Sequence, residues 1–154
     1  MISELIKHAT RFAESIKKEF GINYDLKGIQ FIEKHINENR DSYESKSDKE
    51  KRYNSYKIGS FIGVCMIKNF NGFWTEKENG LGVQIKDHVV FPIQKTYKFL
   101  NEDGIFESLS SFYEISGVLD RILEKKANNP DNRDITILQA KKVMKSKNWW
   151  EFWK

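Results

Sequence analysis

The sequence contains a single cysteine and no apolar run long enough to cross a membrane. Cys65 alone cannot form an internal disulfide or a metal site built from several cysteines, and a chain of this kind is typical of a reducing cytoplasm. A membrane-spanning helix needs roughly 20 consecutive apolar residues, and the sequence has none. Its first residues also lack the basic, apolar and small-residue order of a signal peptide. We therefore expect a cytoplasmic protein.

Motifs of the common enzyme classes are missing as well. The sequence has no phosphate-binding loop, no dinucleotide-binding glycine pattern and no Gly-x-Ser-x-Gly nucleophile elbow. His8, His35 and His88 fall in different predicted elements and outside any zinc-binding spacing. Cys65 lies in an apolar segment, where a buried and unreactive thiol is expected. We therefore predict a protein that is not an enzyme and that holds neither a metal ion nor a cofactor.

One pattern is similar to the catalytic set of metal-dependent nucleases of the restriction type. Gln84, Ile85 and Lys86 lie on a predicted strand, close to Glu76 and Glu78 in the preceding hairpin. Such nucleases place carboxylates around a magnesium ion and a lysine beside the attacked phosphate. The acids here flank a tight turn, where solvated charges are common. A nuclease therefore stays an alternative to the absence of enzymatic activity.

The positive charge of the chain is concentrated near its C-terminal end. The 154 residues have a formal net charge of +4 and are 39% hydrophobic, which fits one globular domain. Residues 121–154 hold 9 Lys or Arg against 4 Asp or Glu, whereas residues 1–120 hold 17 against 18. The body is thus nearly neutral, unlike a nucleic-acid-binding domain that is basic throughout.

Three helices are predicted in the N-terminal half, and the first two follow from apolar spacing. Apolar residues recur at steps of three and four over residues 2–20, and Gly21 is suited to end that helix. Asp25 can cap a second helix, whose apolar face runs to Ile36. Residues 41–52 are almost entirely polar, which predicts a solvated loop and the start of the next helix.

The third helix is expected in the centre of the fold. It would begin at Ser47 or Asp48, and residues 58–70 are apolar on nearly every face. Gly59 and Gly63, one turn apart, each cost about 1 kcal/mol of helix propensity relative to alanine. Their presence predicts the close approach of another backbone across that face.

The apolar pattern then changes from helical spacing to alternation, which predicts three short strands over residues 73–91. Asn79-Gly80 is a strong hairpin signal between the first two strands, and Asp87-His88 is expected to form the second turn. The strands would form an antiparallel meander. Such a sheet needs a helix against one face to be stable.

Two further helices and a tail complete the predicted organisation. A proline opens a short helix over residues 92–100, and Ser108 would start a longer one. The sequence predicts a single α+β domain over residues 1–126, a linker over 127–134 and a basic, tryptophan-rich helix or tail over 135–154.

Glycines and a tryptophan stand at the junctions between the predicted elements of the middle of the chain, about residues 50–120. They are Gly59 and Gly63 in the helix, Gly72 and Trp74 at the first strand, Gly80 and Gly82 at the hairpin, Pro92 at the next helix and Gly104 after it. This order resembles a family of small bacterial domains of unknown function, with a glycine-containing helix, a Gly-x-Trp strand, a hairpin and a Val-x-Pro helix start. The resemblance implies an α+β fold and a bacterial source, and it supplies no catalytic residue.

The tail is the most unusual feature of the sequence. Four of its last six residues are aromatic, namely Trp149, Trp150, Phe152 and Trp153. The helix predicted before them carries Lys141, Lys142, Lys145 and Lys147. Three interpretations remain open. The tail packs on the body with its tryptophans in a surface groove; its aromatics anchor another protein; or its lysines and tryptophans rest on an anionic membrane surface, with nucleic-acid binding as a variant.

Together these observations predict a small bacterial protein whose work is to bind another protein, for example an immunity or antitoxin-like protein that occludes a partner enzyme. The tail aromatics are one candidate contact. The other consists of Glu76, Glu78 and Asp87 at the hairpin tips, which would steer the chain toward a basic partner. The alternative is an adaptor that binds a membrane surface or nucleic acid through the basic tail, and an enzyme of unrecognised type is a third possibility.

Overall fold

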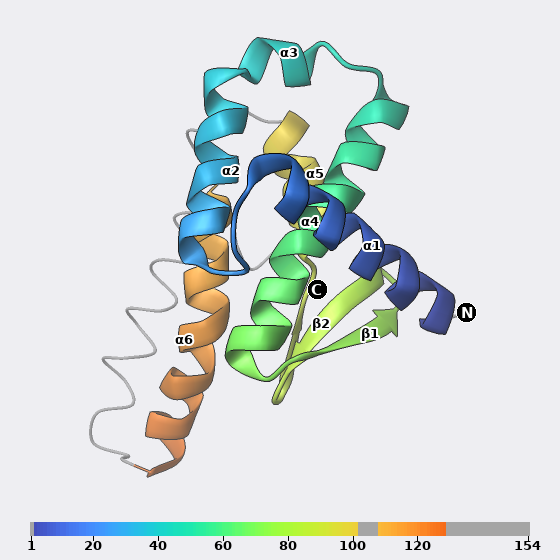
Figure 1. Cartoon of the computed structure of the whole chain (residues 1–154). Helices are drawn as coiled ribbons and strands as arrows, with labels where there is room; N and C mark the ends of the chain where they lie inside the picture. Colours follow the sequence, from blue (N-terminus) through green and yellow to red (C-terminus); the bar gives the residue numbers. More distant parts are fainter. Residues whose placement is uncertain (1, 102–107, 129–154) are drawn as a thin grey trace.

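The computed structural model describes residues 2–101 and 108–128 of the chain (Figure 1). This part has the predicted α+β fold, with six helices and one three-stranded antiparallel sheet. In chain order the elements are α1 (Ile2–Phe20), α2 (Leu26–Glu38), α3 (Arg40–Glu44), α4 (Asp48–Phe70), β1 (Phe73–Lys77), β2 (Gly80–Ile85), β3 (His88–Val90), α5 (Pro92–Asn101) and α6 (Leu109–Asn128). No helix within these residues combines the length and the apolar composition that crossing a bilayer requires.

The predicted starts and stops of the N-terminal helices are confirmed. Gly21 follows α1 with a φ of 62°, the left-handed conformation that glycine adopts easily. An Asp25 carboxylate oxygen accepts a hydrogen bond from the backbone N–H of Gly28 at 2.8 Å, which caps α2. The Ser47 hydroxyl accepts one from the backbone N–H of Glu50 at 3.2 Å and caps α4 in the same way.

The polar segment after α2 contains a helix that the sequence did not predict. Arg40–Glu44 forms α3, where a loop was expected. The Arg40 guanidinium stacks on the Phe99 ring of α5, with its central carbon 4.5 Å from the ring centroid, and donates a hydrogen bond to the Phe99 carbonyl oxygen. Tyr43 packs against the core from the same short helix. Tertiary contacts therefore order a segment whose own composition favours a loop.

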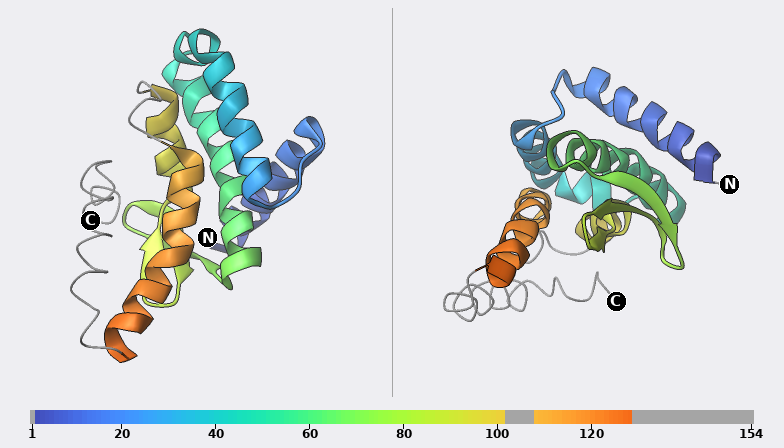
Figure 2. Two further views of the ribbon diagram at one scale, coloured as in Figure 1. Left: turned by 90° about the vertical axis from the view of Figure 1, so that its left-hand side faces the viewer. Right: turned by 90° about the horizontal axis from the view of Figure 1, so that it is seen from below.

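Helix α4 forms the centre of the molecule, as predicted, and lies between α1 on one side and α5 with the sheet on the other (Figure 2). A Cβ atom at Gly59 would lie 2.5 Å from the Cα atom of Ile93, so the expected close backbone is that of α5. At Gly63 the close neighbour is a side chain instead. A Cβ atom there would lie 2.1 Å from Cη2 of Trp74.

Both turns of the meander occur one residue earlier than predicted. The first consists of Glu78-Asn79 and the second of Lys86-Asp87, because Gly80 and His88 already belong to strands. Gly80 has a φ of 108°, a conformation that side chains rarely tolerate. The glycine is thus required at the point where β2 leaves the turn.

Helix α6 is attached to α2 through its first turn. The two carboxylate oxygens of Glu33, on α2, accept hydrogen bonds from the Leu109 backbone N–H at 2.8 Å and from the Ser110 hydroxyl at 2.6 Å. The Ser108 hydroxyl accepts a third from the backbone N–H of Ser111 at 3.1 Å. Ser108 therefore starts the helix, as predicted. The helix ends at Asn128, two residues into the predicted linker, and the rest of that linker lies outside the described residues.

Candidate functional site

The two faces of the sheet differ in exposure because side chains alternate along each strand. Trp74, Val83 and Val90 form one row across the three strands and are buried, with the Trp74 ring against Gly63 of α4. The side of the sheet away from α4 is called the outer face below. It carries Phe73, Thr75 and Lys77 of β1, Gln84 of β2 and Val89 of β3, with Phe91 just after β3.

Phe73 is the most exposed large apolar side chain of the outer face. It is 59% exposed, while its neighbour Trp74 is 8% exposed. By register Phe73 lies beside Gln84, which lies beside Val89. An aromatic ring and an aliphatic side chain therefore share one row of the outer face, a combination frequent at protein-binding surfaces.

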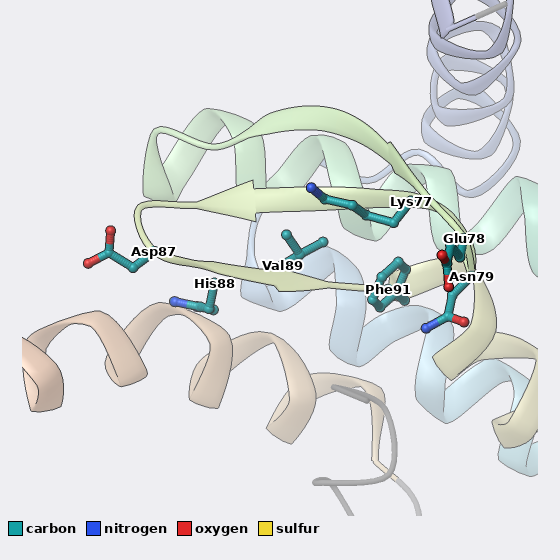
Figure 3. A pocket seen from close by; sticks show the side chains of 7 residues that line it. All are labelled: Lys77, Glu78, Asn79, Asp87, His88, Val89 and Phe91. Carbon is teal, nitrogen blue, oxygen red and sulfur yellow. The ribbon is translucent and has the colours of Figure 1, made fainter.

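An open pocket of about 660 Å³ lies on this face (Figure 3). It is lined by Lys77, Glu78, Asn79, Asp87, His88, Val89 and Phe91. The aliphatic and aromatic side chains of Val89 and Phe91 lie in its middle. Gly82 makes this arrangement possible, because a Cβ atom there would lie 2.8 Å from Cγ1 of Val89 and 2.9 Å from Cε1 of Phe91. A larger residue at position 82 would force these side chains to move, and it would also meet the Val90 carbonyl oxygen at 2.9 Å.

The two turns of the meander place carboxylates at opposite ends of the pocket. Figure 3 shows Glu78 at one end and Asp87 at the other, with Lys77 extending over the sheet between them. Within the described residues neither carboxylate forms an ion pair. The pocket thus has Val89 and Phe91 in its middle, with Lys77 extending over the sheet, and an acidic side chain at each end.

Two of the three predicted acids, Glu78 and Asp87, therefore line the same pocket, and the third does not. Glu76 pairs with Leu81, on the same side of β1 as Trp74, and does not line the pocket. Gln84 pairs with Phe73 and lies on the outer face. Glu76 and Gln84 thus point to opposite sides of the sheet, which separates the residues of the nuclease pattern.

A second, smaller cavity of about 240 Å³ lies where the β1–β2 hairpin meets the helices. It is lined by Leu5, Tyr56, Asn79, Gly80, Leu81, Ile93 and Gln94. Asn79 lines both cavities, so the hairpin tip separates them. The lining of the smaller cavity comes from four separate segments of the sequence, which explains why no local pattern indicated this cavity.

The remaining candidates for chemistry are dispersed. Cys65 is fully buried in α4, and burial raises the pKa of its thiol far above the usual range, as the apolar surroundings predicted. Within the part of the chain that the structure describes, no three His, Cys, Asp or Glu side chains are grouped so that they could hold a metal ion.

The tail residues predicted as binding groups lie outside the described residues. These are the aromatics Trp149, Trp150, Phe152 and Trp153 and the lysines Lys141, Lys142, Lys145 and Lys147. The interpretations that depend on them, including the membrane or nucleic-acid adaptor, stay predictions.

Comparison of the chain with protein-family models, with curated proteins and with solved structures finds no significant match. The resemblance of residues 50–120 to a family of small bacterial domains therefore stays a prediction.

The sequence pointed to the acids of this site but not to its apolar part. Phe73 was assigned only to a strand, and Gly82 only to the hairpin pattern. The signal that could have found Phe73 is a large aromatic residue beside a tryptophan on an alternating strand, since one of the two must face away from the core.

Proposed function

We propose that the protein binds another protein through the outer face of its sheet, in the manner of an immunity or antitoxin-like protein that occludes a partner enzyme. The observation that carries the proposal is the open pocket with an apolar middle and a carboxylate at each end. Apolar contact at the centre of an interface supplies most of the affinity, and Phe73 extends that contact along the same face.

The charges favour a partner with a basic surface. Glu78 and Asp87 attract cationic groups from both ends of the pocket and increase the rate of association. An enzyme that acts on a polyanion concentrates positive charge at its active site. A small domain with an acidic and apolar face is suited to cover such a site.

The test is to capture the partner from lysate of the source cell with the tagged full-length chain and to compare face variants. Phe73→Glu places a charge on the outer face without changing a buried residue. Phe31→Glu is the matched control, because Phe31 is 47% exposed and lies on α2, away from the sheet (Figure 1). Thermal unfolding followed by circular dichroism verifies that both variants fold.

We expect one stoichiometric partner with the wild-type chain and with F31E, and its loss with F73E. The double variant Glu78→Lys with Asp87→Lys should slow association by about tenfold or more at low salt, and less at high salt. Equal recovery by F73E and F31E would show that the outer face is not the binding site. Absence of any partner with the wild-type chain would count against the proposal itself.

A further inference from the structure

We infer that the outer face also binds the chain's own C-terminal segment, residues 129–154, with its terminal aromatics over Phe73 and the apolar middle of the pocket. The inference uses the same face as the proposed function, but the docking requires no partner. Three observations carry it: the composition of the segment, the charge of the pocket and the length of chain after α6.

The composition of the segment matches the face in polarity. Residues 129–154 include three tryptophans and one phenylalanine among their last six residues. On the face, the 59% exposed ring of Phe73 and the partly exposed side chain of Val89 offer apolar surface, and Phe91, only 5% exposed, lines the pocket beside them. Burying indole rings against such a surface is favourable, and aromatic pairs add about 0.5–1.5 kcal/mol to the area term.

The charges of the two parts are complementary. Residues 129–154 contain six Lys or Arg and three Asp or Glu, and four of the lysines lie between positions 141 and 147, just before the aromatics. The pocket has Glu78 and Asp87 at its ends and Lys77 between them, so its lining carries more acidic than basic side chains, and neither carboxylate forms an ion pair within the described residues. Lysines near the aromatics can therefore approach these carboxylates when the rings lie on the face.

The chain after α6 is long enough to reach the face. Helix α6 contacts β2 and contains 20 residues, which corresponds to about 30 Å of helix. Residues 129–148 are another 20 residues before Trp149. As a helix they also cover about 30 Å, and fully extended they cover about 66 Å. The segment can thus return along the whole of α6 to the sheet. Covalent attachment gives it a high effective concentration there, in the millimolar range for flexible linkers.

Disulfide trapping in the full-length chain tests the docking directly. Thr75→Cys places a thiol on the outer face and leaves Phe73 intact, and Asn148→Cys places one beside the tail aromatics. In the control, Lys34→Cys on α2 replaces Thr75→Cys. The Lys34 side chain is 76% exposed, so without docking the control thiol would meet the thiol of the tail at least as often as a thiol at position 75. Native Cys65 is kept in all variants, because it is fully buried and does not compete for disulfide formation.

Under mild oxidation we expect the intramolecular disulfide T75C–N148C to form at least tenfold faster than K34C–N148C, as followed by non-reducing gels and mass spectrometry. Adding Glu78→Lys and Asp87→Lys should reduce that difference. Equal rates for the two pairs would overturn the inference. Disulfide-linked dimers would assign the contact to a second copy and would overturn it as well.

A measurement without cysteine substitutions keeps the test decisive if a variant folds poorly. Trp74 is buried, so the other three tryptophans report on the tail. In the wild-type chain we expect acrylamide, an uncharged quencher, to quench their fluorescence incompletely, and more completely after Glu78→Lys with Asp87→Lys. Identical quenching in both proteins would contradict docking at the pocket. Neither experiment contains a partner protein, so its failure is distinguishable from failure of the capture experiment.

Discussion

Replacing Gly59 by alanine tests the contact on which the position of α5 depends. The added Cβ atom would lie 2.5 Å from the Cα atom and 2.8 Å from the backbone nitrogen of Ile93. Favourable contacts between carbon atoms require about 3.5–4.0 Å. Because the neighbouring atoms are backbone, no rotamer change relieves the overlap. The two helices must therefore separate by about 1 Å or more.

The magnitude follows from two opposing contributions. Overpacking of a well-packed core costs about 1–3 kcal/mol, and a clash with backbone belongs at the upper end of that range. Alanine in place of glycine recovers about 1 kcal/mol of helix propensity. We therefore expect G59A to lower the free energy of unfolding by about 2 kcal/mol.

Urea unfolding followed by circular dichroism measures this change, and Ser60→Ala is the matched control. Ser60 is the next residue of α4 and is fully buried, and its hydroxyl has no hydrogen-bond partner among the described residues. Removing that hydroxyl should leave stability unchanged or raise it by up to about 1 kcal/mol. If G59A were as stable as the wild-type chain with the same denaturant dependence, the close contact between α4 and α5 would be refuted.

Two further predictions concern contacts between distant elements. Glu33→Ala, on α2, removes the acceptor of the Leu109 backbone N–H at the start of α6, so unfolding in urea should show a loss of about 1–2 kcal/mol. Glu38→Ala, an exposed control that is also on α2, should change stability by less than about 0.5 kcal/mol. Similar effects of the two substitutions would contradict the capping role of Glu33. The Tyr97 hydroxyl donates a hydrogen bond that lowers the pKa of the Asp48 carboxyl, so Tyr97→Phe should raise that pKa toward its ordinary value in an NMR titration. Because the pKa of Asp48 is lowered in the folded state, this interaction stabilises the protein above the unfolded pKa of about 4, and the stabilisation is lost as the pH falls through the folded-state pKa. An unchanged Asp48 pKa in Y97F would show that the hydrogen bond is not formed in solution.

Local signals were sufficient for most of the secondary structure. Asp25 and Ser47 cap helices because each has an extended backbone, from which its own side-chain oxygen reaches an N–H group of the first turn, whatever the rest of the fold does. Gly21 stops α1 for an equally local reason. Arg40 shows the limit of such reasoning, since α3 depends on Phe99, which is 59 residues away in the sequence.

The candidate site was only partly predictable for the same reason. Glu78 and Asp87 were identified because they stand at turns, where charges are exposed. Their placement at the ends of one pocket depends on the register of the sheet and on the packing of the Val89 and Phe91 side chains against Gly82. Single positions in the sequence do not encode that convergence.

What the sequence by itself determined is the order of the elements other than α3, the α+β class, the central position of α4 and the need for a close neighbour at Gly59. These follow from periodicity, capping and the cost of glycine in a helix. Only the tertiary structure decided that the neighbour is the start of α5, that the Trp74 ring occupies the space at Gly63, and that Phe73 is left exposed on the outer face. The physical reason is that alternation fixes which residues share a face of a strand, while packing against α4 decides which face is covered.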